Sequence, residues 1–151
     1  MAARPGLSRM PDKAPAVRHR VLIVDDEEST RLLLAKLLTR DVGVEAVLAG
    51  TCEQALRLAG NYAYDCILLD LMMPGVGGVE VLKRIRASSP NESTPVVVVS
   101  VLSDKTTVDL CMAVGATAYL VKPVERHSLA STVRAQIAAR RKPRKTTRKD
   151  D

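Results

Sequence analysis

Residues 96–100 read Val-Val-Val-Val-Ser, four consecutive β-branched side chains followed by a hydroxyl. β-Branched residues favour extended chain, and an unbroken apolar run is typical of a parallel strand that is covered on both faces. Similar short runs occupy residues 21–24, 66–69 and 118–121. A further run at 44–48 is interrupted by Glu45, which suits an edge strand. We therefore expect a sheet of five parallel strands.

The segments between these runs have helical periodicity, with apolar residues three or four positions apart, as at Leu34 and Leu38. Thr51 and Gln54 form a capping-box signature at the start of one such segment. We expect the leucines of these segments, together with Met112, to lie in the core. Regular alternation of strands and helices predicts an α/β fold, a three-layer doubly wound parallel sheet.

The composition narrows the classes of protein. A chain of 151 residues with 46% hydrophobic residues has material for one core and no need of disulfides or metals for stability. Phe and Trp are absent, which disfavours a nucleic-acid binder that stacks bases on aromatic rings. The three cysteines are odd in number and lack metal-ligand spacing, so we expect reduced thiols and a cytoplasmic protein. No apolar stretch has the length of a membrane span.

Charge is distributed unevenly along the chain. The net charge is +6, yet residues 1–20 hold five Lys or Arg and one Asp, and residues 138–151 hold seven Lys or Arg and two Asp. The remaining body is therefore mildly acidic. We expect a disordered basic tail over residues 1–19, one folded domain over 20–138 and a second disordered basic tail over 139–151.

Polar residues follow four of the five apolar runs directly. Asp25 and Asp26 follow the first run, Asp70 the third, Ser100 belongs to the end of the fourth, and Lys122 follows the fifth. Ligands in such sheets bind outside the carboxyl ends of the strands, so these groups are expected to converge. Three neighbouring carboxylates call for a hard cation, and Mg²⁺ accepts carboxylates, water and phosphate oxygens. A carboxylate beside a metal and a lysine can become an aspartyl phosphate.

The stretches VLIVDDE, ILLDLMMPGVGG, VVVVS and GATAYLVKP resemble those of the receiver domain of bacterial two-component response regulators, over about residues 20–138. The resemblance implies a flavodoxin-like sheet of order 2-1-3-4-5. It also implies that Asp70 accepts a phosphoryl group from a histidine kinase or phosphotransfer protein. Asp25, Asp26 and Asp70, with the backbone carbonyl of Met72, would bind the Mg²⁺.

The same resemblance implies a conformational switch. Ser100 and Lys122 match the hydroxyl and ammonium that bond phosphoryl oxygens, Tyr119 matches the aromatic residue that moves with the hydroxyl, and Pro123 would follow a cis peptide bond. The face formed by the fourth helix, fifth strand and fifth helix would then bind a downstream protein or a second copy of the chain. These features describe a stand-alone phosphoprotein of signal transduction or a phosphorelay, with no enzymatic activity beyond its own phosphorylation and dephosphorylation.

Three alternatives remain open at this stage. A degenerate receiver would keep Asp70 only as a salt-bridge partner of Lys122 and act as an interaction module. Haloacid-dehalogenase-type phosphatases also form an aspartyl phosphate, but they carry a second Asp two residues after the nucleophile, where this chain has Met72. A nucleic-acid binder would work through the basic tails.

Overall fold

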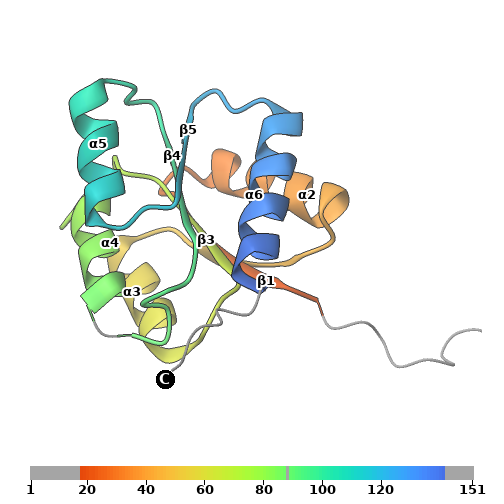
Figure 1. The fold of residues 1–151 in the computed structure, drawn as a ribbon, viewed down its shortest axis with the longest axis horizontal. Helices are drawn as coiled ribbons and strands as arrows, with labels where there is room; N and C mark the ends of the chain where they lie inside the picture. The colour runs from red at the N-terminus through yellow and green to blue at the C-terminus, as the bar shows by residue number, and fades with distance from the viewer. Residues whose placement is uncertain (1–17, 88, 142–151) are drawn as a thin grey trace, which may run out of the picture.

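The computed structural model describes residues 18–87 and 89–141, which form alternating strands and helices (Figure 1). The strands are β1 (Arg20–Val24), β2 (Glu45–Ala49), β3 (Cys66–Leu69), β4 (Val96–Ser100) and β5 (Ala118–Val121). The helices are α2 (Glu28–Asp41), α3 (Cys52–Asn61), α4 (Gly78–Ala87), α5 (Lys105–Val114) and α6 (Arg126–Arg141). Every apolar run of the sequence has become a strand.

The five strands form one parallel sheet in the order β2-β1-β3-β4-β5, which confirms the expected fold class. The strand that contains Glu45 lies at an edge, as its broken apolar pattern predicted, and Glu45 itself is exposed. The central strands β3 and β4 are buried at every position. This burial explains why their sequences are continuously apolar rather than alternating.

Two apolar clusters cover the two faces of the sheet. Helices α3, α4 and α5 pack on one face, which includes Leu22 and Val98, and helices α2 and α6 pack on the other, which includes Ile23 and Val97. Figure 1 shows the two helical layers on either side of the strands. Alternate residues of one strand therefore enter different clusters, as the two-residue period of a strand requires.

The helix starts follow the expected capping chemistry with one difference. The Thr51 hydroxyl accepts a hydrogen bond from the Gln54 N–H at 3.0 Å, as in a capping box. The Gln54 side chain, however, accepts from the N–H of Gly50 at 2.9 Å, one residue before the cap. Asp104 caps α5, and its side chain accepts a hydrogen bond from the N–H of Thr107 at 3.0 Å.

Some expectations about the core and the chain ends need correction. Met112 is 42% exposed, and Leu32 and Leu33 are 49% and 54% exposed, so the prediction that Met112 and the helical leucines are all core residues was wrong. Each of these helices buries only a narrow stripe, such as Leu34 and Leu38 in α2. Helix α6 also continues through residues 139–141. The rest of the two expected tails lies outside the described residues, apart from positions 18 and 19.

None of the helices within 18–87 and 89–141 combines the length and apolar character that crossing a bilayer requires.

Gly78 lies where the first turn of α4 meets the end of β3. A Cβ atom at this position would lie 2.5 Å from the Leu71 Cα and 2.6 Å from the Asp70 carbonyl oxygen. The Gly78 N–H also donates to the Leu71 carbonyl oxygen at 3.1 Å. Only glycine allows the helix to start this close to the strand end, because both contacts involve backbone that cannot move aside.

We expect Gly78→Ala to lower the free energy of unfolding by about 1–3 kcal/mol, the usual cost of forcing a carbon into packed structure. Gly60→Ala is the matched control, since nothing lies within 4 Å of a Cβ at that helical position. It should stabilise the protein by roughly 0.5–1 kcal/mol through helix propensity. Urea unfolding of both variants measures the difference, and equal stabilities would contradict the close contact at Gly78.

Candidate functional site

The carboxyl edge of the sheet brings together all five polar groups that follow the strands. Sheet hydrogen bonding places the residues just beyond the strand ends: the Asp25 N–H donates to Ala49 at 3.1 Å and the Asp70 N–H to Val24 at 3.0 Å. Between β4 and β5, the Lys122 N–H donates to the Ser100 carbonyl oxygen at 2.8 Å. The backbone ladder therefore fixes where each side chain starts.

Three carboxylates converge at this edge. Oxygen atoms of Asp25, Asp26 and Asp70 all lie within 4.8 Å of one another. Asp25 is 1% exposed and Asp70 is 5% exposed, while Asp26 is exposed. All of these ligand atoms are oxygens, which suits a hard divalent cation such as Mg²⁺.

Lys122 bridges two of the carboxylates. Its ammonium lies 2.8 Å from Asp25 Oδ2 and 3.6 Å from Asp70 Oδ2. Burial alone would lower the pKa of Lys122, but the hydrogen bond to Asp25 and the charges of Asp70 and Asp25 together raise it. The lysine therefore stays charged, and one ammonium faces three acids.

The Asp70 carboxyl experiences opposing effects. Burial raises its pKa, and the Met72 N–H, which donates to Oδ1 at 3.2 Å, and the Lys122 charge lower it only in part. The negative charges of Asp25 and Asp26 raise the pKa further, so the net direction is upward. A positive ion between these acids would relieve the repulsion.

Ser100 and Tyr119 lie on neighbouring strands at the same edge. Ser100 is completely buried, and its hydroxyl oxygen accepts from the Leu102 N–H at 3.2 Å. The Tyr119 hydroxyl donates to the Leu102 carbonyl oxygen at 2.6 Å, and its ring packs against the cluster that contains Val98. Both side chains thus hold the segment that leads from β4 to α5. The peptide bond between Lys122 and Pro123 is cis.

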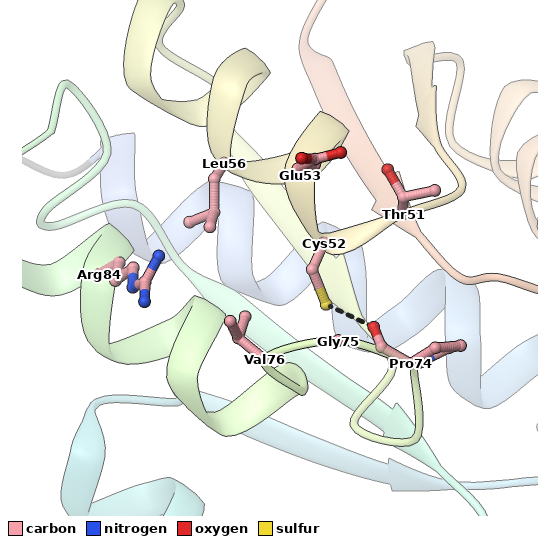
Figure 2. A pocket seen from close by; sticks show the side chains of 8 residues that line it. All are labelled: Thr51, Cys52, Glu53, Leu56, Pro74, Gly75, Val76 and Arg84. Atoms are coloured by element: carbon pink, nitrogen blue, oxygen red, sulfur yellow. Dashed lines mark hydrogen bonds between the residues drawn. The ribbon is translucent and has the colours of Figure 1, made fainter.

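The loop after Asp70 borders a hollow of about 420 Å³, shown in Figure 2. Its walls are the start of α3, the loop at Pro74–Val76 and Arg84 of α4. The Cys52 thiol donates to the Pro74 carbonyl oxygen at 3.5 Å and so ties the loop to α3.

The three cysteines are all free and buried, so they act as packing residues. Burial raises the pKa of Cys66 to about 12.

Sequence reasoning missed Arg31 as a support of the site. Its guanidinium donates to the Asp25 carbonyl oxygen at 2.6 Å and lies under Gly50, where a Cβ would be only 2.9 Å away. Asp25 is also held by the Glu27 N–H, which donates to Oδ1 at 2.9 Å. The hydrogen bond from Glu27 is the local turn that an Asp side chain commonly forms with the N–H two residues later. The Arg31 contact has no such signal, because nothing in the sequence distinguishes Arg31 from other arginines of the helices.

The five-stranded order and the acidic edge agree with one family. Residues 21–134 match the sequence profile of the response regulator receiver domain. The chain belongs to this family. The resemblance expected from four short motifs therefore extends over most of the described residues, and the receiver domain is a signalling domain of two-component systems.

Known relatives give the extent of the similarity. The receiver is 35% identical over 121 residues to the DNA-binding response regulator MtrA of Mycobacterium tuberculosis, covering 80% of this chain and 51% of that protein. Among solved structures, chemotaxis protein CheY4 of Vibrio cholerae is 32% identical with a TM-score of 0.74, over 80% of this chain and 99% of that one. This chain thus spans about half the length of MtrA and nearly all of CheY4.

A third relative bears on the acidic cluster. The receiver domain of sensor histidine kinase PA1611 from Pseudomonas aeruginosa is 25% identical with a TM-score of 0.74, over 81% of this chain and 99% of that one. That structure is described with a magnesium ion coordinated in its active-site cleft.

The crowded carboxylates lead to a stability prediction. In metal-free buffer at neutral pH, Asp70→Asn should raise the free energy of unfolding by about 1 kcal/mol, because it removes a buried charge whose pKa is raised by burial and by like charges. Thermal unfolding in the presence of a chelator measures this gain. Glu53→Gln, which neutralises an exposed acid on α3, is the control and should have little effect. A destabilised Asp70→Asn would show that Lys122 outweighs the repulsion.

Proposed function

We propose that Asp70 is the phosphoacceptor of this receiver domain and takes a phosphoryl group from a histidine kinase or phosphotransfer protein in a Mg²⁺-dependent reaction. The observation that supports this best is the convergence of three carboxylates and one ammonium on a single edge, with ligand oxygens within 4.8 Å. Mg²⁺ would be held by Asp25, Asp26, Asp70 and the Met72 carbonyl. When bound, Mg²⁺ would neutralise phosphoryl oxygens and so favour attack of the Asp70 carboxylate on phosphorus.

The residues of the chain divide the work of the transfer. A carboxylate oxygen of Asp70 forms the new bond to phosphorus while the bond from phosphorus to the donor nitrogen breaks, and the electron pair leaves with the donor imidazole. The Lys122 ammonium lies 3.6 Å from Asp70 Oδ2, and it would neutralise a phosphoryl oxygen as the phosphoryl group reaches Asp70. Phosphorylation removes the negative charge of the Asp70 carboxylate and adds the charge of the phosphoryl group, which Lys122 still faces.

Ser100 and Tyr119 would couple phosphorylation to the protein surface. A phosphoryl oxygen is a strong acceptor for the Ser100 hydroxyl, whose oxygen accepts a hydrogen bond from the Leu102 N–H. Leu102 is also the partner of the Tyr119 hydroxyl, so movement at Ser100 changes the support of Tyr119. The signal would pass to the face of α5, β5 and α6, where a downstream protein or a second copy binds.

The donor must approach over the rim of the site, and α2 offers an apolar surface there. A groove of about 410 Å³ lies between α2 and the segment after β5, with Lys122 in its wall. Its lining is mainly apolar and includes Leu33, Leu37, Val101, Pro123 and Val124. We assign this groove to the histidine-containing donor, because it is continuous with the site through Lys122 and the donor must present its imidazole to Asp70.

Nothing that the described residues show favours phosphatase chemistry, since Met72 stands where the second Asp would lie. The degenerate receiver differs from our proposal only in whether Asp70 reacts. We also propose a cytoplasmic location, which fits the free cysteines and a kinase partner.

Phosphorylation is tested by incubation with acetyl phosphate and Mg²⁺ followed by intact mass spectrometry. We expect a gain of one phosphoryl group that requires Mg²⁺ and is absent in Asp70→Asn, because the substitution removes the carboxylate oxygen that we propose forms the bond to phosphorus. Asp109→Asn, an exposed acid on α5, is the control and should be phosphorylated normally. A folded wild-type protein that gains no mass with Mg²⁺ would favour the degenerate receiver.

Donor docking is tested by Leu33→Glu. We expect at least a tenfold slower transfer from a phosphorylated histidine phosphotransfer protein, about 1.4 kcal/mol, because a charge would replace an apolar contact. Phosphorylation by acetyl phosphate, which needs no docking surface, should be unchanged. Leu110→Glu places the same change on an exposed leucine of α5, on the other side of the sheet. Equal slowing by both substitutions would remove the assignment of the groove.

A further inference from the structure

A second recess lies where the last turn of α2 meets the first turns of α6, away from the carboxylate cluster. Its volume is about 470 Å³. Seven residues line it: Arg40, Asp41, Glu125, Arg126, His127, Ala130 and Arg134. Four of them are basic side chains and two are acidic. The recess has no part in the phosphorylation described above.

Both acids of the recess are already occupied. Asp41 is held by the Arg126 guanidinium through two hydrogen bonds of 2.7 Å each, and this contact lowers the pKa of Asp41. Glu125 caps α6, since its two carboxylate oxygens accept from the N–H groups of His127 at 3.0 Å and Ser128 at 2.9 Å. The charges of Arg40 and Arg134 also lower the pKa of Asp41, after the larger effect of the Arg126 hydrogen bonds, but the Asp41 carboxylate itself is hydrogen-bonded to Arg126.

Two guanidinium groups of the recess, those of Arg40 and Arg134, make no direct contact with a carboxylate among the described residues. Arg134 donates to the Asp41 carbonyl oxygen from one of its three nitrogens, and both arginines are exposed. His127 lies seven residues before Arg134, so the two share a face of α6. The guanidinium groups of Arg40 and Arg134 make this α6 face positive.

The charge of the whole chain is divided in the same way. From Arg126 to the end the sequence has nine Lys or Arg and two Asp, and α6 itself has no acid. Residues 20–125 have ten Lys or Arg and fourteen Asp or Glu. A receiver body that is negative overall thus carries a helix of opposite sign.

We propose that this α6 face, with Arg40 and Arg134 at its centre, binds the phosphate backbone of double-stranded nucleic acid. Guanidinium groups match phosphate oxygens in charge and geometry. Binding would be independent of base sequence, because the chain has no Phe or Trp for stacking and the recess offers no extended element for a groove. A membrane surface fits less well, since Ala130 is the one apolar residue of the recess and residues 142–151 have no large apolar side chain.

The test is fluorescence anisotropy of a labelled 20-base-pair duplex of arbitrary sequence, titrated with the full chain at 50 to 200 mM NaCl. We expect binding that weakens steeply with salt. The double variant Arg40→Gln/Arg134→Gln should reduce the slope of log K against log salt by about 1.8, or about 0.9 for each lost phosphate contact. Arg57→Gln/Lys83→Gln removes the same charge from exposed positions on α3 and α4, on the opposite face, and should leave the slope unchanged.

Several results would overturn the proposal. These are no binding to the duplex at 50 mM NaCl, equal weakening by both double variants, or binding that depends only on residues 142–151 when a chain truncated after Arg141 is compared. Binding to vesicles that contain anionic phospholipid, without binding to the duplex, would reassign the face to a membrane. Arg40→Gln alone keeps the test valid if the Arg134 substitution loosens the packing of α6 on α2, because the Arg40 side chain makes no hydrogen bond within residues 18–87 and 89–141.

Discussion

The rest of this structure depends on the contact between one ammonium and two buried carboxylates. Lys122 joins Asp25 and Asp70 across the sheet, and these three residues come from the ends of β5, β1 and β3. Because three acids face a single lysine, the site keeps an excess of negative charge, and burial together with the charges of Asp25 and Asp26 raises the pKa of Asp70. The fold supplies the frame that holds these acids together, and a divalent cation bound between them would relieve the repulsion.

The sequence predicted most of the frame, for reasons that can be named. The four valines of β4 predicted a strand because β-branched residues favour extended chain. A strand buried on both faces also has no polar positions to interrupt such a run. Asp70 and Lys122 could be read as neighbours because parallel strands end at one edge, although 52 positions separate them in the sequence. The edge position of β2 followed from a single charged residue, Glu45.

Other features had no local signal. The periodicity of α2 shows which side faces the core but not how much of the flank is covered, so Leu33 was placed in the core although it is 54% exposed. The pair of Arg126 and Asp41 joins residues 85 positions apart on two exposed helix ends, where many other pairings are sterically possible. The close approach of Gly78 to the Asp70 carbonyl oxygen is visible only in the folded chain, because glycines close together in a sequence indicate only a tight loop.

The scarcity of aromatic residues has an optical consequence. With no Trp and only three Tyr, the near-ultraviolet signal of the protein comes from tyrosines in three different surroundings. Tyr62 is 53% exposed, Tyr64 is buried with the Arg20 guanidinium 5.8 Å from its ring, and Tyr119 is bonded to the Leu102 carbonyl. Tyr119 is the tyrosine whose hydroxyl lies at the carboxyl edge of the sheet. The unlabelled protein therefore carries its own chromophore at the position where the carboxylate site meets the surface.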